Sequence, residues 1–274
     1  MTRNFKIINN RTPAFYTSRL PLILFSLCLL FFTASEVWAG NNTSSNPKPV
    51  ADFDGDGKSD ISVFRPSNGS WYILNSSGGY SVVKWGLAQD VPIPGDYDGD
   101  GRTDVAVYRY GNNSWYILRS SDNTAFIRQW GTFIREEGYI YFVWDAPIPA
   151  DYDGDGVTDL AVYTEQDYLP APGKFVILQS STGKQFEKEL GTNMDEVVPA
   201  DYDGDGKADI AVFRDESFTA GADKVGNWYI SQSSDNSMRV EKFGLEDDKP
   251  VPADYDGDGK ADIAVWRPSN GFWY

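Results

Sequence analysis

One acidic loop of nine residues occurs five times in the chain, as DFDGDGKSD, DYDGDGRTD, DYDGDGVTD and twice as DYDGDGKAD. The copies are 44, 55, 50 and 53 residues apart and begin at Asp52, Asp96, Asp151, Asp201 and Asp254. A motif that recurs at this spacing is typical of a repeat architecture, in which each repeat is one supersecondary unit. The loop therefore constrains the fold more than any other feature of the sequence.

Each loop is followed by the same succession of short apolar segments. A run such as DISVFR or DVAVYR comes first, then a turn such as PSNG, then WYIL or a variant, and finally a segment that ends in W-G, L-G or F-G. A segment with proline, such as VPIPGD, precedes the loop. Runs of β-branched and aromatic residues bounded by Gly, Asn, Asp and Ser predict four short strands in each repeat. We therefore expect an all-β fold.

The predicted strands are apolar on both faces, so each small sheet has to be covered on both sides. Stacking the sheets around an axis achieves this and favours a β-propeller of four-stranded blades, with a linear solenoid as the alternative. The fifth repeat stops inside its third strand at Tyr274, which predicts four complete repeats plus a partial fifth in a truncated chain. Closure with four blades and a remnant, or with five blades of which one takes a strand from residues 41–50, would be the other solutions.

The N-terminus has the pattern of a signal peptide. Four basic residues precede the apolar run LPLILFSLCLLFFTA, and VWA at residues 37–39 offers a cleavage site before Gly40. A retained membrane anchor is the alternative. The apolar run is shorter than the ~20 residues that a membrane-spanning helix needs, which favours the signal peptide. We predict a secreted or cell-surface protein, or a periplasmic one, with no membrane insertion after signal removal. The predicted segments are a signal peptide at 1–39, a linker at 40–47 and propeller repeats at 48–274, divided at about 48–91, 92–146, 147–197, 198–249 and 250–274.

Composition excludes several classes of function. The chain has no histidine, and its one cysteine, Cys28, lies in the leader, so Ser-His-Asp and Cys-His nucleophiles and His/Cys zinc sites are excluded. Without the leader, 20 basic and 39 acidic residues remain, a net charge of −19. Nucleic acids and anionic membranes need a basic footprint and are poor partners. The five loops hold 20 of the acidic residues, which indicates bound cations.

The loop has the chemistry of a site for a hard cation. Carboxylates stand at positions 1, 3, 5 and 9 of each copy, glycines at 4 and 6, and position 7 can offer its backbone carbonyl. Calcium takes about 6 to 8 oxygen ligands and tolerates irregular geometry, so we predict Ca²⁺, about one per loop and up to five. A polar turn without metal is the alternative. An EF-hand would need glutamate at position 12, where the copies have Val63, Val107, Val162, Val212 and Val265.

The D-x-D-x-D-G-x-x-D loop within a repeat of about 50 residues resembles the FG-GAP or VCBS repeat, the unit of the integrin α-subunit propeller. The resemblance covers residues 48–274. It implies calcium at every loop, with the loops joining strands 1 and 2 on the lower face of a propeller. Mapped onto positions 1, 3, 5, 7 and 9, the implied metal sites are Asp52, Asp54, Asp56, Lys58 and Asp60; Asp96, Asp98, Asp100, Arg102 and Asp104; Asp151, Asp153, Asp155, Val157 and Asp159; Asp201, Asp203, Asp205, Lys207 and Asp209; Asp254, Asp256, Asp258, Lys260 and Asp262.

The repeats differ most in the connections between blades and between the second and third strands. The connection after Trp130 expands to residues 131–146, and the other expansions are at 164–173 and 214–226. Insertions gathered on one face often mark a binding surface, although an extra strand at a blade edge would also explain residues 139–144. Thr164 replaces the arginine that follows the second strand in the other copies. The candidate ligand-binding residues are Arg135, Tyr139, Tyr141, Trp144, Tyr168 and Phe218.

Aromatic rings beside carboxylates suit a glycan or an extracellular protein as the partner. We therefore expect an exported, non-catalytic binding or adhesion module in which the calcium loops stabilise each blade. A polysaccharide lyase or hydrolase on the same scaffold is the alternative, with Glu136, Glu137, Glu165 and Asp167 as available carboxylates, but no spacing marks an acid–base pair. A structural role in a larger surface assembly is the third interpretation. No catalytic residue is predicted.

Overall fold

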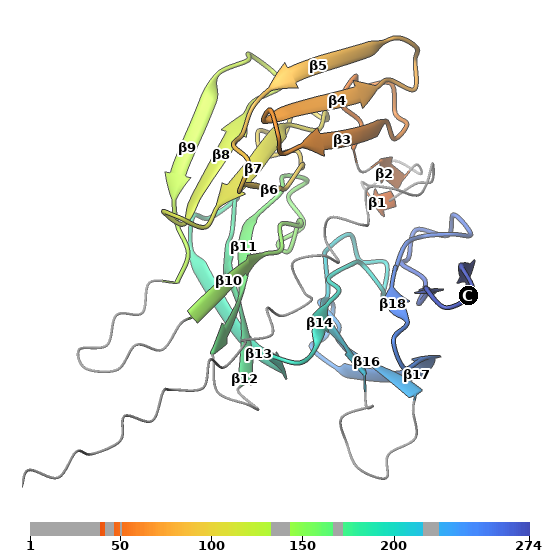
Figure 1. Ribbon diagram of the computed structural model, residues 1–274. Helices are drawn as coiled ribbons and strands as arrows, with labels where there is room; N and C mark the ends of the chain where they lie inside the picture. Colours follow the sequence, from red (N-terminus) through yellow and green to blue (C-terminus); the bar gives the residue numbers. More distant parts are fainter. Residues whose placement is uncertain (1–38, 42–46, 50, 133–142, 167–171, 216–224) are drawn as a thin grey trace, which may run out of the picture.

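The computed structural model describes residues 39–41, 47–49, 51–132, 143–166, 172–215 and 225–274. Every element within these ranges is a β-strand, which confirms the all-β prediction. None of the described residues belongs to a helix that is long and apolar enough to cross a membrane. Apart from one two-stranded ladder, the described strands form five small antiparallel sheets, arranged as the blades of a β-propeller (Figure 1). The predicted signal peptide lies outside the described residues, except for Ala39.

Three blades have four strands each, in sequence order. Blade 2 consists of β6 (Val91–Pro92), β7 (Val105–Arg109), β8 (Ser114–Leu118) and β9 (Ala125–Gln129). Blade 3 consists of β10 (Val143–Pro147), β11 (Leu160–Gln166), β12 (Pro172–Leu178) and β13 (Gln185–Thr192). Blade 4 consists of β14 (Glu196–Val197), β15 (Ile210–Asp215), β16 (Val225–Ser231) and β17 (Met238–Leu245).

Blades 1 and 5 have three strands each. The described residues therefore form three complete four-stranded blades, where the sequence predicted four. Blade 1 is β3 (Ile61–Arg65), β4 (Ser70–Leu74) and β5 (Tyr80–Lys84); blade 5 is β18 (Lys249–Pro250), β19 (Val265–Arg267) and β20 (Phe272–Trp273). The segment that would be the first strand of blade 1 is β2 (Pro47–Pro49), which pairs with β1 (Ala39–Asn41) in a separate ladder. Prolines at both ends of β2 have no N–H, so only Lys48 can donate to a sheet. This segment lends no strand to blade 5 either.

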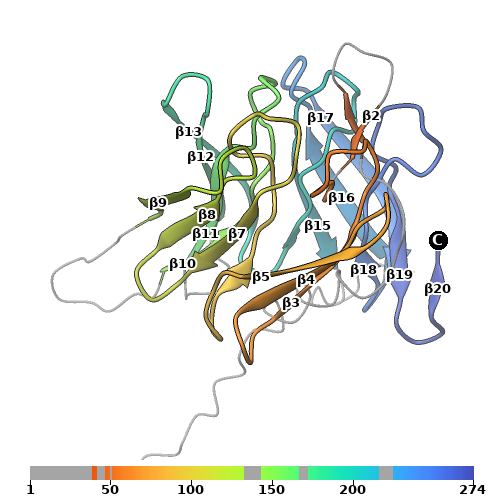
Figure 2. The ribbon, with the colours of Figure 1, turned by 90° about the horizontal axis from the view of Figure 1, so that it is seen from above.

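The hydrophobic core lies between neighbouring blades. Alternate residues of β7 face opposite ways: Val105 and Val107 pack with Trp71 of blade 1, whereas Ala106 and Tyr108 pack with blade 3. Two further clusters join blade 3 to blade 4 and blade 4 to blade 5. The view from above shows the sheets of blades 2, 3 and 4 side by side (Figure 2). Sheets covered on both faces are what the two-sided apolar runs predicted.

A buried tryptophan anchors the third strand of three blades to the fourth. The side chains of Trp71, Trp115 and Trp228 are fully buried, with 0% exposure. The indole N–H of Trp115 donates to the carbonyl oxygen of Trp130 at 3.1 Å, and the other two indoles make equivalent bonds at 3.0 Å. These residues therefore belong to the blade core and are not ligand-stacking groups.

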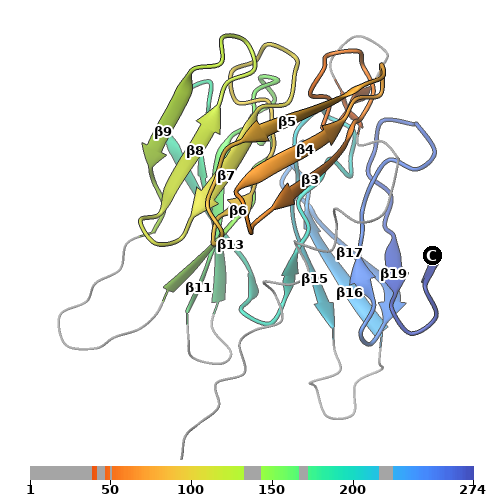
Figure 3. The same ribbon diagram turned by 45° about the horizontal axis from the view of Figure 1, so that its top comes forward.

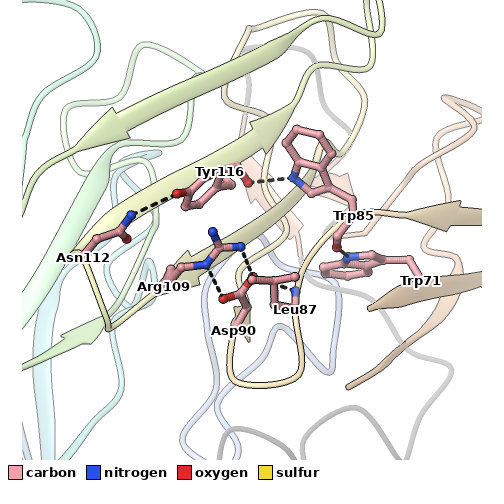
Figure 4. A network of polar contacts seen from close by, with 7 residues as sticks. All are labelled: Trp71, Trp85, Leu87, Asp90, Arg109, Asn112 and Tyr116. Atoms are coloured by element: carbon pink, nitrogen blue, oxygen red, sulfur yellow. Dashed lines mark hydrogen bonds and ion pairs between the residues drawn. The ribbon is translucent and has the colours of Figure 1, made fainter. Parts of the chain in front are cut away.

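An arginine–aspartate pair fixes the connection that enters a blade to the second strand of that blade. In blade 2, Nε and Nη2 of Arg109 donate to the two carboxylate oxygens of Asp90 at 2.8 Å (Figure 4). The backbone N–H of Leu87 donates to the same carboxylate at 2.8 Å, and the guanidinium lies 4.1 Å above the ring of Tyr116. We call this arrangement the arginine latch. It recurs as Asp195 with Arg214 and as Asp248 with Arg267.

Candidate metal centres

Each acidic loop closes a tight hairpin at one end of a blade. In blade 1 the N–H of Asp60 donates to the carbonyl of Ala51 at 2.8 Å. In the other blades the residue before the loop and the ninth residue of the loop form an isolated β-bridge. The loops therefore join the first strand to the second in blades 2 to 5, as expected. The bridged pairs are Gly95 with Asp104, Ala150 with Asp159, Ala200 with Asp209, and Ala253 with Asp262.

The carboxylates at positions 1, 3 and 9 converge in all five loops. One oxygen from each of the three lies within 4.8 Å of the other two, so each group could hold a metal ion. Three carboxylate oxygens on one centre suit a hard cation. The groups are Asp52, Asp54 and Asp60; Asp96, Asp98 and Asp104; Asp151, Asp153 and Asp159; Asp201, Asp203 and Asp209; and Asp254, Asp256 and Asp262.

The first aspartate organises the backbone of its loop. Oδ1 of Asp52 accepts the N–H of Gly55 at 2.6 Å, and Oδ2 accepts the N–H of Gly57 at 2.9 Å. The same two bonds occur in the other four loops. Gly55 and Gly57 have φ angles of 79° and 84°, a left-handed conformation that side chains disfavour. This requirement explains the glycines at positions 4 and 6.

The aspartate at position 5 stands outside the converging group. In the second loop, Asp100 accepts the backbone N–H of Arg102 at 2.8 Å and the hydroxyl of Ser120 at 2.9 Å. The fifth-position residues Asp56, Asp155 and Asp205 make the same contacts, and Asp258 accepts the N–H of Lys260. Metal binding by positions 5 and 7 stays a prediction.

A pair of serines in the turn between the third and fourth strands contacts the loop, and the sequence analysis missed it. In blade 2 the N–H of Ser120 donates to Asp104 at 2.6 Å, and the hydroxyl of Ser121 donates to Asp98 at 2.6 Å. The turn therefore holds two of the three converging carboxylates in place. The signal was visible, since Ser-Ser recurs after the third strand at 76–77, 120–121, 180–181 and 233–234. The other three pairs make equivalent bonds.

The ninth-position aspartates have raised pKa values. The pKa of Asp104, Asp159 and Asp209 is raised from 3.8 to about 6 mainly by burial, with a further contribution from the neighbouring third-position carboxylates and an opposing one from the hydrogen bonds of the serines. A raised carboxyl pKa means that negative charge is poorly compensated at this point. A cation held by the group would compensate it, so the residues present fit a metal ion.

Neighbouring loops contact one another along the ring of blades. The N–H of Thr103, at position 8, donates to the carbonyl of Asp52, at position 1 of the preceding loop, at 2.7 Å. The side chain at position 7 also lies across the fourth-position glycine of the preceding loop: a Cβ on Gly55 would be 2.7 Å from Nε of Arg102. The backbone bond recurs from Thr158 to Asp96, Ala208 to Asp151 and Ala261 to Asp201. The five loops therefore form one continuous chain of contacts.

The strand ends that flank the expanded connections lie at the opposite end of the blades. Because the strands are antiparallel, the β12–β13 turn shares the loop end, whereas β11 ends and β12 begins at the other end, which we call the connection end. Figure 3 shows β11 and β15 running away from the loops. Trp144 lies in β10, paired with Glu165 of β11. The other candidate ligand-binding residues lie outside the described residues: Arg135, Tyr139, Tyr141, Tyr168 and Phe218.

Residues 96–162, from the second acidic loop into β11, match the family model of the FG-GAP-like repeat. The matched stretch, in blades 2 and 3, is similar to an FG-GAP-like repeat. No curated protein matches it. An FG-GAP-like propeller indicates a binding module in general terms.

Solved structures with similarity to this chain share little of its sequence. A lectin from Agrocybe aegerita, described as recognising non-reducing terminal N-acetylglucosamine, is 17% identical with a TM-score of 0.47, over 80% of this chain and 59% of the lectin. BBS1N, solved in complex with ARL6DN, is 12% identical with a TM-score of 0.46, over 88% of this chain and 73% of that one. A protein from Lactobacillus plantarum is 13% identical with a TM-score of 0.39, over 78% and 60%. This chain thus spans less than two thirds of the lectin and of the Lactobacillus plantarum protein.

Proposed function

We propose that this chain is an exported calcium-binding propeller that acts as a non-catalytic binding or adhesion module. In this proposal calcium stabilises each blade at the loop end, and a glycan or an extracellular protein binds at the connection end. The observation that carries the proposal is the convergence of three carboxylates in every one of the five loops. An arrangement kept in all repeats serves the common framework, which leaves the varied end for recognition.

Calcium is the cation that the loop chemistry favours. The converging side-chain donors are carboxylate oxygens, and the described chain contains neither histidine nor cysteine that would favour a softer metal. The loop is a turn of backbone held by hydrogen bonds, which supplies oxygens in an irregular arrangement. Calcium accepts such geometry, whereas magnesium requires a near-ideal octahedron. When bound, the ion would neutralise the converging carboxylates and hold them together.

The contribution of calcium to stability follows from mass action. At an extracellular affinity of ~0.1 to 1 mM and calcium near ~1 mM, each site adds about 0.4 to 1.4 kcal/mol to the free energy of unfolding. A typical domain has a net stability of about 5 to 15 kcal/mol, so several sites together are a large fraction of it. In a chain whose one cysteine is Cys28, this replaces the support that disulfides give other exported proteins.

A calcium titration tests the metal part of the proposal. We expect calorimetry and metal analysis of the purified chain to find up to five bound calcium ions per molecule. Asp98→Asn, which removes a converging carboxylate, should lower the number by one or weaken one site at least tenfold. Asp122→Asn is the matched control, because Asp122 is exposed on a nearby turn and bonds to Thr124 instead of the loop. Absence of calcium binding at ~1 mM would contradict the proposal.

Migration through native gels tests the binding part. The purified chain is run through gels that contain a panel of polysaccharides, once in calcium and once in chelator. We expect one polysaccharide to retard the protein in calcium without any shortening of the polymer. Shortened polymer would show catalysis and overturn the non-catalytic assignment. If no polysaccharide retards the chain, the glycan branch is wrong and the protein partner remains.

A further inference from the structure

Blade 3 has the aspartate of the arginine latch but not its arginine. Asp145 occupies the position of Asp90, six residues before the acidic loop, while Thr164 stands in the place of Arg109. The Thr164 hydroxyl donates to Oδ1 of Asp145 at 3.2 Å, and the Thr132 N–H donates to Oδ2. These are neutral donors. Within the part of the chain that the structure describes, no cationic side chain is bonded to Asp145, which is only 4% exposed.

A second polar group next to Asp145 has no hydrogen-bond partner. The buried hydroxyl of Tyr108 is without one among the described residues. A Cβ added to Gly131 would lie 2.6 Å from Oδ2 of Asp145 and 3.1 Å from this hydroxyl, so both atoms face the same spot. In blade 3 the equivalent tyrosine, Tyr163, donates to two backbone carbonyls at 3.1 Å. A buried carboxylate without its cation and an unsatisfied hydroxyl therefore both lie against Gly131.

The intact latches show what group fits this carboxylate. In blades 2, 4 and 5 two guanidinium nitrogens reach the aspartate at 2.8 Å. The arginine side chains stay 26%, 33% and 20% exposed above aspartates that are almost fully buried, so the guanidinium position borders on solvent. In blade 3 the smaller Val176 replaces the tyrosine that the guanidinium covers elsewhere. Thr132 remains partly exposed, and its hydroxyl bonds to Thr164.

We propose that Asp145 is the receptor for the guanidinium group of an arginine side chain on a protein partner that docks at the connection end of blade 3. The inference rests on the proposed binding role of that end and names the partner chemistry. Arginine fits better than lysine because its planar fork can bond to both oxygens of one carboxylate. The guanidinium displaces the hydroxyls of Thr132 and Thr164, and pairs a buried charge that is costly to leave alone. The net charge of −16 favours a basic partner.

The test uses a short probe and an internal competitor. The purified full chain in calcium is titrated with the peptide acetyl-Gly-Arg-Gly-amide, and with the same peptide carrying citrulline, which has the shape of arginine without its charge. Binding is followed by NMR shifts at Tyr108, Thr132 and Asp145. We expect the citrulline peptide to bind at least about tenfold more weakly. Thr164→Arg supplies an internal guanidinium and should abolish peptide binding while raising the melting temperature.

Two more variants complete the test. Arg214→Thr opens the equivalent place in blade 4 and should add a second site for the arginine peptide. Asp145→Asn should remove the first site, and if it fails to fold, Thr164→Arg still decides because it keeps the carboxylate. Equal binding of both peptides, no binding, or binding unchanged by Thr164→Arg would overturn the inference. Calcium content is measured on the same samples, so a chain that binds calcium but not the peptide loses only this inference.

Discussion

The two ends of the blades differ in how much they repeat. At the loop end, the same bonds hold the first aspartate, the two glycines and the serine pair in one blade after another. At the connection end, segment lengths vary and one arginine latch has lost its arginine. The loop end is bonded both within and between blades, so a change in one copy affects its neighbours. The connection end also has bonds between blades, such as Lys249 with Glu196 and the Asp247 N–H with Asp215, but these are not the same bond repeated along the chain, so a single connection can change without altering a repeated contact.

Among the changes considered, removal of calcium should have the largest effect on stability, and it should act through the loop end. We expect chelation to lower the free energy of unfolding by about 2 to 7 kcal/mol, the sum over five sites of moderate affinity. Denaturant unfolding in ~1 mM calcium and in chelator measures the difference. The Arg109→Thr variant, altered at the connection end only, should lose a similar amount on chelation. Identical unfolding midpoints in both media would show that the loop end does not depend on metal.

A fall in pH should change the stability of the protein in opposite directions with and without calcium. Without calcium, the folded-state pKa of Asp104, Asp159 and Asp209 is about 6 against an ordinary value of 3.8. The folded state then binds more protons than the unfolded state between these values, so stability rises as the pH falls through 6. With calcium, protons compete with the metal and stability falls over the same interval.

Unfolding curves at several pH values in both media check these opposite slopes. Asp145 contributes with the same sign, because burial raises its pKa to about 6 as well. The Asp145→Asn variant removes that contribution and leaves the part due to the loops. Parallel slopes in calcium and in chelator would rule out competition between protons and metal at the loops.

An arginine latch can be broken without touching a loop. Arg109→Thr leaves the buried Asp90 with neutral donors only, the Leu87 N–H and a threonine hydroxyl placed as in blade 3, and the charge-assisted bonds that it loses are worth about 2 to 3 kcal/mol. Thermal unfolding measures the loss. Arg128→Thr is the control, because Arg128 is exposed on β9 and should change stability by less than about 0.5 kcal/mol. Equal effects of the two variants would mean that the latch does not stabilise the blade.

Contact between neighbouring loops can be isolated with two glycines of similar backbone conformation. Gly55→Ala and Gly57→Ala both place a side chain in the left-handed region, which costs about 1 to 2 kcal/mol. A Cβ at Gly55 would also meet Arg102 of the next loop, whereas at Gly57 nothing lies within 4 Å. We therefore expect NMR shift changes in the second loop for Gly55→Ala only. Equal changes for both variants would show that the loops are independent.

The smallest effect is expected at the serine pair. Ser120→Ala removes the hydroxyl bond to Asp100 but keeps the backbone bond to Asp104, which predicts a loss of about 0.5 to 1.5 kcal/mol. Calcium affinity of the second loop should fall with it, as calorimetry would show. Ser237→Ala is the control, since its hydroxyl bonds to Gln232 and not to a loop. A larger effect of the control would contradict a role of the serines in the loop.

Much of the fold and of the candidate site was predictable from local patterns. Three converging aspartates come from one loop of nine residues, so their spacing already indicated a common centre. Valine at position 12 placed the loop before a strand, and Val107 indeed lies in β7. Trp115 lies in a segment that is apolar on both faces, which predicts a buried strand, and it is fully buried. Each of these properties depends on a short stretch of chain.

The features that sequence reasoning missed join distant residues. Asp90 and Arg109 are 19 positions apart, and nothing between them indicates that they meet. The departure at Thr164 was visible, but its meaning depended on knowing that Asp145 is the partner of that position. The crowding at Gly55 could not be predicted, because the side chain that crosses it belongs to the next blade. The strand missing from blade 1 depended on a competing pairing with residues 39–41.

The bond from one loop to the next has an evolutionary consequence. The N–H of Thr158 meets the carbonyl of Asp96 at 2.7 Å, as the N–H of Thr103 meets that of Asp52, so every junction offers the same donor and the same acceptor. An unequal crossover that deleted the second repeat would place the N–H of Thr158 opposite the carbonyl of Asp52. That contact has the same donor and acceptor as the existing junctions. A repeat can thus be lost or duplicated in one genetic step without inventing an interface, and the requirement to close the ring selects the number that persists.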